Sequence, residues 1–492
     1  MKIAVLRERT EGESRVAATP ETVAKLIGLG AGVTVEKGAG SGSRIADEQF
    51  SASGATIGAD ARTTLAGADI VLVVRRPAAA DLAGVNPGAL LIGALDPYGN
   101  DGDVAALAKA GVTAMVMEFM PRITRAQVMD ILSSQANLAG YQAVIEAASV
   151  FDRAMPMMMT AAGTVRPAKA FVMGAGVAGL QAIATAKRLG AVVSATDVRA
   201  AAGEQVESLG AKFIMTEALK DASGTGGYAR ELTKDEQAAQ AELVAGHISK
   251  QDIVITTALI PGRPAPKLVT RAMVESMAPG SVIVDLAAER GGNVELTQPG
   301  KVIDHNGVVI IGYTNLAGRI PTTASQLYAR NLLSFIDTLV DKKEKKLAIN
   351  WDDELVKATV LTRNGAVVHP NFVAAAKTGD IVTAPSGAVS GDVVSAKPKP
   401  APKKPAAKAE PKDAPVKTGA AKKPAAIKKT APKAEAAPAP EAVVTPAPAV
   451  PVVAKKAPAR KPATPKADAV AKEPAAKKPA SKKPAAKPEE GK

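Results

Sequence analysis

The chain has 492 residues, room for two or three domains, and a net charge of +14 that is unevenly distributed. Residues 391–492 hold 24 Lys and Arg against 9 Asp and Glu, so the rest of the chain is nearly neutral. There are no cysteines, which excludes disulfides and thiol chemistry, and with only three histidines no metal site is expected. We find no run of ~18 apolar residues and no signal-peptide core, so we expect a cytoplasmic protein.

Residues 1–120 alternate between strand and helix signals. Short apolar runs predict strands at 2–6, 32–38, 68–74, 88–95 and 112–118. Helices closed by glycine are predicted at 21–30 and 103–111. This alternation is typical of βαβ units and a largely parallel sheet. A long helical pattern over 125–151 follows, then an apolar loop around Met155–Met159, which we expect to pack in a core or an interface.

A dinucleotide-binding fingerprint lies in the middle of the chain. A predicted strand at 170–173 leads into Gly174-x-Gly176-x-x-Gly179, and a helical pattern opens at Val177. Gly174 allows a sharp turn, Gly176 lets the backbone approach a pyrophosphate, and Gly179 lets the helix pack close to the strand. The free N–H groups at the start of the helix would face the phosphates.

Asp197 completes the fingerprint. It follows the predicted strand at 191–196 and lies 18 residues after Gly179. Its carboxylate can accept hydrogen bonds from the adenosine ribose diol and would repel a 2′-phosphate, which predicts NAD(H) rather than NADP(H). The alternative is a glycine-rich turn that binds no ligand.

The remaining patterns predict a second sheet and a discontinuous first domain. Further strands are expected at 211–215, 252–258, 281–287 and 308–313, and a helix over 323–340 has Tyr328, Leu332, Phe335 and Leu339 on one face. The expected fold class is α/β, with two doubly wound Rossmann-like domains and a cleft between them. We expect the domains to be 1–134 with 325–385, 135–324 for NAD(H), and a tail, 391–492.

Two stretches lack a regular pattern. Ser223–Gln240 is glycine-rich, then charged, and contains Tyr228; we interpret it as a mobile lid over the cofactor, with a surface insertion as the alternative. Residues 391–492 are mainly Ala, Lys and Pro and cannot bury enough apolar surface to fold, so we expect a disordered tail. The tail either contacts an anionic membrane weakly or is a solvated extension. An NAD-sensing module whose tail binds nucleic acid is a further alternative, but no nucleic acid is expected.

Two segments carry a family resemblance. Arg7–Gly42 is similar to the start of the alanine dehydrogenase and proton-pumping nicotinamide nucleotide transhydrogenase superfamily. Pro121–Gln142 resembles domain I, the NAD(H)-binding component of the transhydrogenase alpha subunit, and the resemblance covers about 1–385. It implies a proton-translocating, Si-Re specific transhydrogenase in which hydride passes from NADH to NADP⁺ held by a partner subunit. It also implies a membrane-domain partner, a homodimer and a peripheral place at the inner membrane.

The resemblance assigns roles to single residues. It implies that Arg122, Gln127, Asp130 and Ser133 contact the nicotinamide and its ribose, the first three being the catalytic candidates, and that Tyr228 closes over NAD(H). Other interpretations stay open. Arg122 and Asp130 could form an internal ion pair, Gln127 could cap its helix or face solvent, and Ser133 could pack in the core.

The alternative function is an NAD-dependent amino-acid dehydrogenase of the alanine type. Such an enzyme needs a general acid or base and a carboxylate anchor. The alanine dehydrogenase pattern has a Lys where this chain has Arg75 or Arg76, a His where it has GALDPYGN at 93–100, and an Asp where it has Glu289. Arg15 of the substrate-binding pattern is present. The missing His favours the transhydrogenase, because hydride transfer between two nicotinamides needs no protein acid or base.

Overall fold

The computed structural model describes residues 1–216, 233–260 and 262–373. All of them lie in Met1–Pro400, which forms one compact unit. Tyr228, most of the predicted lid and the basic tail lie outside the described residues.

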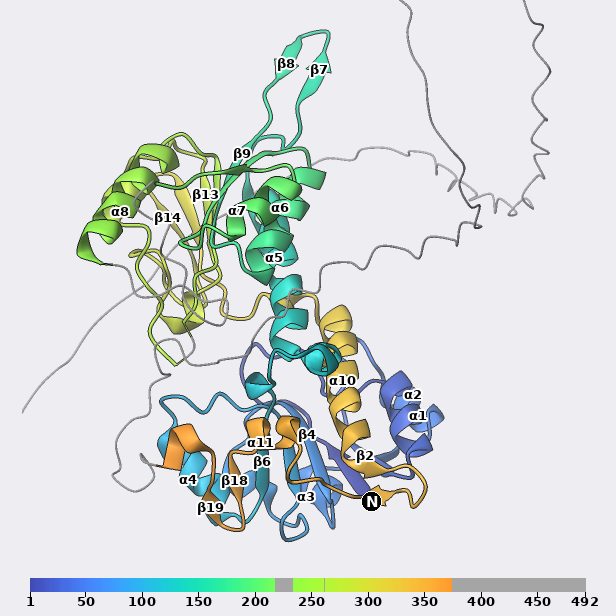
Figure 1. The fold of residues 1–492 in the computed structure, drawn as a ribbon. Helices are drawn as coiled ribbons and strands as arrows, with labels where there is room; N and C mark the ends of the chain where they lie inside the picture. Colours follow the sequence, from blue (N-terminus) through green and yellow to red (C-terminus); the bar gives the residue numbers. More distant parts are fainter. Residues whose placement is uncertain (217–232, 261, 374–492) are drawn as a thin grey trace, which may run out of the picture. The chain divides into compact units, whose positions relative to one another are not determined.

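The first sheet is parallel and has the strand order β3-β2-β1-β4-β5-β6 (Figure 1). Its strands are β1 (Lys2–Val5), β2 (Gly32–Glu36), β3 (Thr56–Gly58), β4 (Ile70–Arg75), β5 (Leu90–Ala94) and β6 (Thr113–Val116). The helices between them are α1 (Pro20–Gly28), α2 (Asp47–Ala52), α3 (Ala61–Leu65) and α4 (Asp101–Lys109). The strands are almost fully buried, as expected for a parallel sheet covered on both faces.

The second sheet has the order β11-β10-β9-β12-β13-β15-β14, with β14 as an antiparallel edge strand. Its strands are β9 (Lys169–Met173), β10 (Val192–Thr196), β11 (Lys212–Phe213), β12 (Ile253–Thr256), β13 (Val282–Asp285), β14 (Val302–His305) and β15 (Val308–Ile311). The helices are α6 (Val177–Arg188), α7 (Ala202–Ser208), α8 (Lys234–Ile248) and α9 (Arg271–Glu275).

Both sheets are wound in the same way. In each, the first strand of the series is central, the next two lie on one side, and the fourth and fifth lie on the other. The direction of winding therefore reverses between β1 and β4 and again between β9 and β12. In open parallel sheets, ligands bind outside the carboxyl ends of the strands at this point. The expected α/β class with two Rossmann-like sheets is confirmed.

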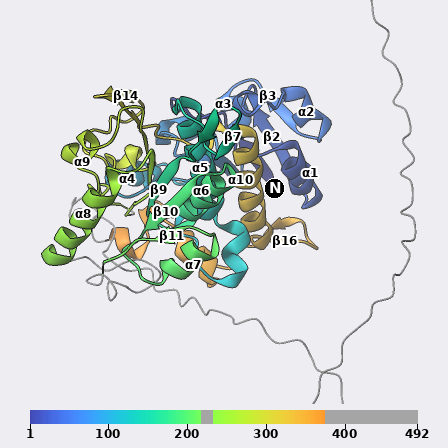
Figure 2. The same cartoon turned by 90° about the horizontal axis from the view of Figure 1, so that it is seen from above.

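Two long helices, α5 (Ile131–Val150) and α10 (Pro321–Thr338), pack against each other, and α5 also packs along α6 (Figures 1 and 2). A Cβ at Gly140 of α5 would lie 2.0 Å from the Ala178 carbonyl oxygen of α6, so only glycine allows this approach. The expected apolar face of α10 is confirmed, because Tyr328, Leu332, Phe335 and Leu339 are buried. These side chains pack in one core with residues of the first sheet.

Segments after α10 add to the first sheet's cores without adding a strand to it. They are β16 (Val340–Asp341), β17 (Lys346–Leu347), α11 (Glu354–Thr359), β18 (Thr362–Arg363) and β19 (Ala366–Val367). Leu355 and Val356 pack in the core that contains α10, and Phe372 packs under α4 with Leu107. The domain boundaries proposed from the sequence stay a prediction.

Four local predictions were wrong or incomplete. The short strands β3 and β14 were missed, because three or four residues are too few to show a period. The helix predicted from 125 begins at Ile131, because Asp130 caps it and a 3₁₀ helix, η4 (Thr124–Met129), precedes it. The loop predicted around Met155–Met159 leads into a hairpin of β7 (Met158–Thr160) and β8 (Gly163–Val165), which projects from the second sheet in Figure 1.

The fourth difference concerns the predicted lid, Ser223–Gln240. Its described end is helical, because α8 begins at Lys234. Thr233 and Glu236 form a capping box, in which each side chain accepts a hydrogen bond from the other's backbone N–H. Only the part before this cap can belong to a lid.

Two buried carboxyl groups tie the carboxyl ends of the first sheet's strands together. Glu8 accepts hydrogen bonds from the N–H groups of Val74 (2.6 Å) and Arg75 (3.1 Å). Glu118 accepts from Asp96 (2.7 Å) and Leu95 (3.2 Å). Burial raises the pKa of each from 4.5 to about 7, against the effect of these backbone hydrogen bonds.

These carboxyl groups predict a pH-dependent stability. Because the pKa of each is higher in the folded than in the unfolded chain, the stability it contributes is complete below pH 4.5 and is lost as the pH rises through about 7. We expect the thermal midpoint of unfolding to fall between pH 5 and pH 8. A Glu8→Gln/Glu118→Gln variant, whose amides stay neutral, should show a smaller fall in a melting series.

The matched control is Glu48→Gln, which alters an exposed glutamate of α2. It should leave the fall in the midpoint unchanged. An unchanged slope in the double variant would mean that Glu8 and Glu118 do not titrate in this range.

Candidate functional site

The glycine-rich turn follows β9 directly. Gly174 has φ +101°, a backbone conformation that favours glycine. A Cβ at this position would lie 2.5 Å from Thr257 Oγ1. The Thr257 hydroxyl donates to the Gly174 carbonyl oxygen at 3.2 Å, so the loop after β12 closes on the turn. The sharp turn expected at Gly174 is present.

Gly176 and Gly179 define the start of α6. Gly176 is the N-cap, and a Cβ there would meet no heavy atom within 4 Å. A Cβ at Gly179 would lie 1.8 Å from the Gly174 carbonyl oxygen, a distance that no side chain allows. Val177, the first residue of the helix, is 41% exposed. Because N–H groups in a first helical turn lack intrahelical partners, the open space at Gly176 is suited to an anion.

Asp197 lies directly after β10 and next to this turn. Its carboxylate accepts the Ala175 N–H at 2.7 Å, which joins the acid to the glycine-rich turn. It also accepts three hydrogen bonds from Arg199: from the backbone N–H at 2.8 Å and from Nε and Nη2 at 2.9 Å each. The Asp197 residue is 7% exposed. Arg199 is a site residue that sequence reasoning missed, although it lies only two positions further on.

The four residues expected on the nicotinamide side lie around η4 and the start of α5. Arg122 and Gln127 have exposed side chains. Asp130 is the N-cap of α5: it accepts the Ser133 N–H at 2.8 Å and the Ser133 hydroxyl at 2.5 Å. Asp130 and Ser133 therefore have a structural role beside any role in binding. Their contacts to a ligand stay a prediction.

Close packing of α5 on α6 connects these residues to the fingerprint. The Asn137 amide of α5 donates to Gln181 of α6 at 3.4 Å, and Gly140 lies against Ala178. Asp130 precedes Gly140 by ten residues, about 15 Å along a helix. The two expected groups of site residues are thus carried by two helices in direct contact.

A network of charged side chains occupies the carboxyl edge of the first sheet. Glu13 accepts two hydrogen bonds from the Arg15 guanidinium (2.8 and 2.7 Å), one from Arg75 (3.1 Å) and one from the Asn315 amide (3.1 Å). Burial favours a higher pKa for Glu13, but the hydrogen bonds and charges of Arg15 and Arg75 lower it to about 2. Glu13 is therefore held ionised. Sequence reasoning missed Glu13 and Asn315, because they lie 302 residues apart.

The same network reaches the loop after β13. Arg75 forms an ion pair with Glu289 at 3.2 Å, and Asp96 forms one with Arg290. Asp96 lies in the segment where the alanine dehydrogenase pattern has its His, and its φ is +41°. Arg76 instead pairs with Asp103 at 2.8 Å. The structure thus selects Arg75 as the basic residue that faces Glu289.

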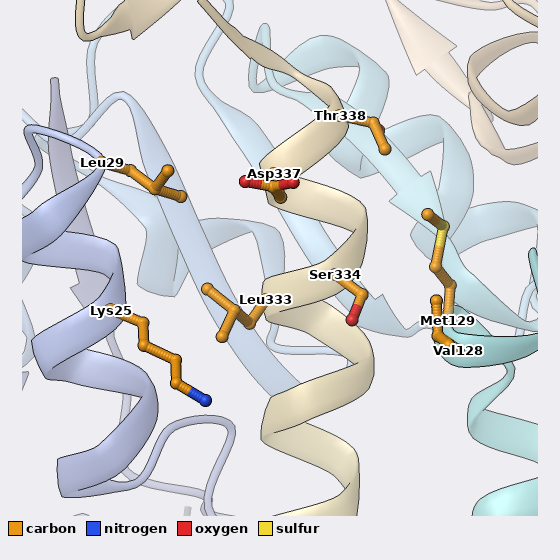
Figure 3. Close-up of a pocket in the computed structure, with 8 residues that line it drawn as sticks. All are labelled: Lys25, Leu29, Val128, Met129, Leu333, Ser334, Asp337 and Thr338. Carbon is orange, nitrogen blue, oxygen red and sulfur yellow. The ribbon is translucent and has the colours of Figure 1, made fainter. Parts of the chain in front are cut away.

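A surface pocket of about 480 Å³ borders η4 on the side of α1 and α10 (Figure 3). It is lined by Lys25, Leu29, Val128, Met129, Leu333, Ser334, Asp337 and Thr338. Val128 and Met129 lie between Gln127 and Asp130, but none of the expected site residues lines the pocket. We therefore do not assign the cofactor to it.

The described residues place two limits on other chemistry. Among them, no group of three or more His, Asp or Glu side chains could hold a metal ion. No helix in the same ranges is both long and apolar enough to cross a bilayer.

Comparison with known proteins identifies relatives over most of the described chain. The models of the N-terminal and C-terminal domains of alanine dehydrogenase/PNT match residues 4–139 and 143–370. The first of the polypeptides that make up NAD(P) transhydrogenase subunit alpha in Rhodospirillum rubrum is 56% identical over 377 residues, which cover 75% of this chain and 98% of that protein. The protein of the same name from Rickettsia prowazekii is 47% identical over 75% of this chain and 96% of its own length.

Alanine dehydrogenases are more distant. That of Halomonas elongata is 30% identical over 75% of this chain and 95% of its own length. Among solved structures, a transhydrogenase from Sinorhizobium meliloti matches with 59% identity and a TM-score of 0.68, over 75% of this chain and all of that one. An L-alanine dehydrogenase matches with 26% identity and a TM-score of 0.64. The chain belongs to the alanine dehydrogenase/PNT family and is most similar, within these matches, to its transhydrogenase alpha subunits.

Proposed function

We propose that this chain is the NAD(H)-binding subunit of a proton-translocating NAD(P)⁺ transhydrogenase. Hydride would pass directly and with Si-Re specificity between NADH bound here and NADP⁺ held on a partner subunit. The observation that carries the proposal is the open backbone at Gly176, next to Asp197 and at the start of α6. High identity to proteins named transhydrogenase subunit alpha supports it.

The residues present fit a dinucleotide. Gly176 leaves room for a pyrophosphate against the first turn of α6, and Asp197 would accept the adenosine ribose hydroxyls. Gly174, Val177 and Gly179 would shape the same turn. Arg122, Gln127, Asp130 and Ser133 would orient the nicotinamide half, and Tyr228 would close over it. The nicotinamide ring, when bound, supplies the hydride; the chain supplies position and exclusion of water.

The charged network is an argument against amino-acid dehydrogenation. That reaction moves a proton as well as a hydride, so one group must be free to change its charge. Arg15 and Arg75 are bound to Glu13, and Asp96, in the segment of the expected His, is paired with Arg290. Glu8 and Glu118 have a pKa near 7, but backbone N–H groups hold their oxygens. Hydride transfer between two nicotinamides needs none of these groups.

The partners follow from the reaction. We propose separate membrane-domain and NADP(H)-binding subunits, which would hold the chain at the cytoplasmic side of the inner membrane. We also propose a homodimer. The β7–β8 hairpin supports it, because Met157, Met158 and Met159 are 61%, 43% and 81% exposed, and apolar side chains grouped in this way mark interaction surfaces. Met155 is buried and belongs to the chain's own core.

The first test measures hydride transfer. The full-length chain with NADH and an NADP⁺ analogue should show no transfer alone and rapid transfer after addition of an NADP(H)-binding transhydrogenase component. The reason is that donor and acceptor rings must come within about 3–3.5 Å, which one binding site cannot achieve. Absorbance of the reduced analogue reports the reaction. Oxidation of NADH by pyruvate and ammonia, without transfer to the analogue, would instead identify an amino-acid dehydrogenase.

A glycine pair tests the cofactor site. Gly176→Ala should weaken NADH binding at least about tenfold without changing the melting temperature, because the added methyl enters space that is open only without ligand. Gly179→Ala should destabilise the fold by about 3 kcal/mol or more, because its methyl collides with backbone. NADH fluorescence titration and thermal melting report the two effects.

The matched control is Gly246→Ala in α8, where a Cβ also meets no heavy atom within 4 Å. It should bind NADH normally and melt at the same or a higher temperature. If Gly176→Ala binds NADH as the wild type does, the pyrophosphate does not lie at this turn.

The hairpin tests the homodimer. Met157→Ser/Met159→Ser should raise the dimer dissociation constant about tenfold or more, since large apolar side chains dominate such interfaces. Analytical ultracentrifugation measures it. Val302→Ser, at an exposed position of the edge strand β14, serves as the control and should have no effect. A dimer equally stable in all three proteins would place the interface elsewhere.

A further inference from the structure

The acid expected to recognise the ribose has no free acceptor site. Its four hydrogen bonds come from the Ala175 N–H and from the N–H, Nε and Nη2 groups of Arg199, at 2.7–2.9 Å. A carboxylate has about four lone-pair positions, so this set is complete. Two of the bonds form a fork, with Nε on Oδ1 and Nη2 on Oδ2 of Asp197.

This fork has the pattern that a ribose diol would offer. A diol donates two neighbouring O–H groups to the two oxygens of one carboxylate, and a guanidinium donates two neighbouring N–H groups to the same pair. The Ala175 N–H comes from the glycine-rich turn and would stay in place. The guanidinium of Arg199 is therefore the group that ribose hydroxyls would have to displace.

Arg199 is placed where it could move. It lies between β10 and α7, outside regular secondary structure, and its side chain is 27% exposed whereas that of Asp197 is 7% exposed. The linking segment is short, so an Arg199 side chain that leaves Asp197 keeps its positive charge beside the ribose. A cation there offsets the repulsion between Asp197 and a 2′-phosphate.

We infer that Arg199 determines nucleotide specificity by competing with the ribose hydroxyls for Asp197. The inference rests on the proposed binding of NAD(H) at this turn. In the free chain the guanidinium occupies the diol's two acceptor oxygens, and binding of NADH must displace it. The competition lowers the affinity for NADH, and the displaced cation weakens discrimination against NADPH.

Two variants separate competition from charge. Arg199→Ala removes both the fork and the cation, so NADH should bind about threefold to tenfold more tightly and NADPH more weakly or unchanged. Arg199→Lys loses the fork but retains a cation, so NADH should again bind more tightly while NADPH affinity is kept. Fluorescence titration of the full-length proteins with NADH and with NADPH measures all four constants, and thermal melting verifies that both variants are folded.

The control is Arg188→Ala, which removes one positive charge from an exposed position in the last turn of α6. It should leave the NADH/NADPH affinity ratio as in the wild type. Weaker NADH binding in Arg199→Ala would show that Arg199 supports the ligand, and an unchanged ratio would show that it is neutral; either result overturns the inference and leaves the proposed function intact. A wild-type chain that binds neither nucleotide would overturn both.

Discussion

The candidate nucleotide site depends on how closely α6 approaches the turn after β9. A Cβ at Gly179 would lie 1.8 Å from the Gly174 carbonyl oxygen, so the helix starts as near to the strand as two backbones allow. This closeness directs the first turn of α6 at the edge where β9 and β12 diverge, which is where open parallel sheets bind ligands. It also lets the Ala175 N–H reach Asp197 at 2.7 Å, so that the turn and the acid form one rigid group.

A second close contact extends this arrangement to the first half of the chain. Gly140 of α5 lies against the Ala178 carbonyl oxygen, one residue before Gly179. Because α5 begins at the Asp130 cap, its packing on α6 also fixes the position of η4 and of the exposed Gln127 side chain. Two glycines, neither of which needs to touch a ligand, thus connect the residues expected at the two ends of a dinucleotide.

Local patterns in the sequence predict most of the fold, and their failures have local causes. Strands of five or so apolar residues and the glycine spacing of the fingerprint are sufficient for both sheets, whereas β3 and β14 are too short to show a pattern. Apolar spacing continues through η4, so only the cap at Asp130 reveals where α5 begins. The network around Glu13 has partners 62 and 302 residues away, and no local signal could indicate it. The Arg199 contact is different, since it lies two residues from Asp197 and follows from charge and proximity alone.

The charged network acquires a reason when the reaction requires no acid or base. A dehydrogenase that moves a proton must keep one group free to change its charge, and the surrounding residues must tolerate that change. Here Glu13 is held ionised by two arginines, with a pKa near 2, and Asp96 is bound to Arg290 from the other sheet. Residues freed from proton transfer can instead hold loops in place. Transfer of hydride alone depends on the position and orientation of two rings, so a rigid carboxyl edge on the first sheet serves this chemistry better than a titrating one.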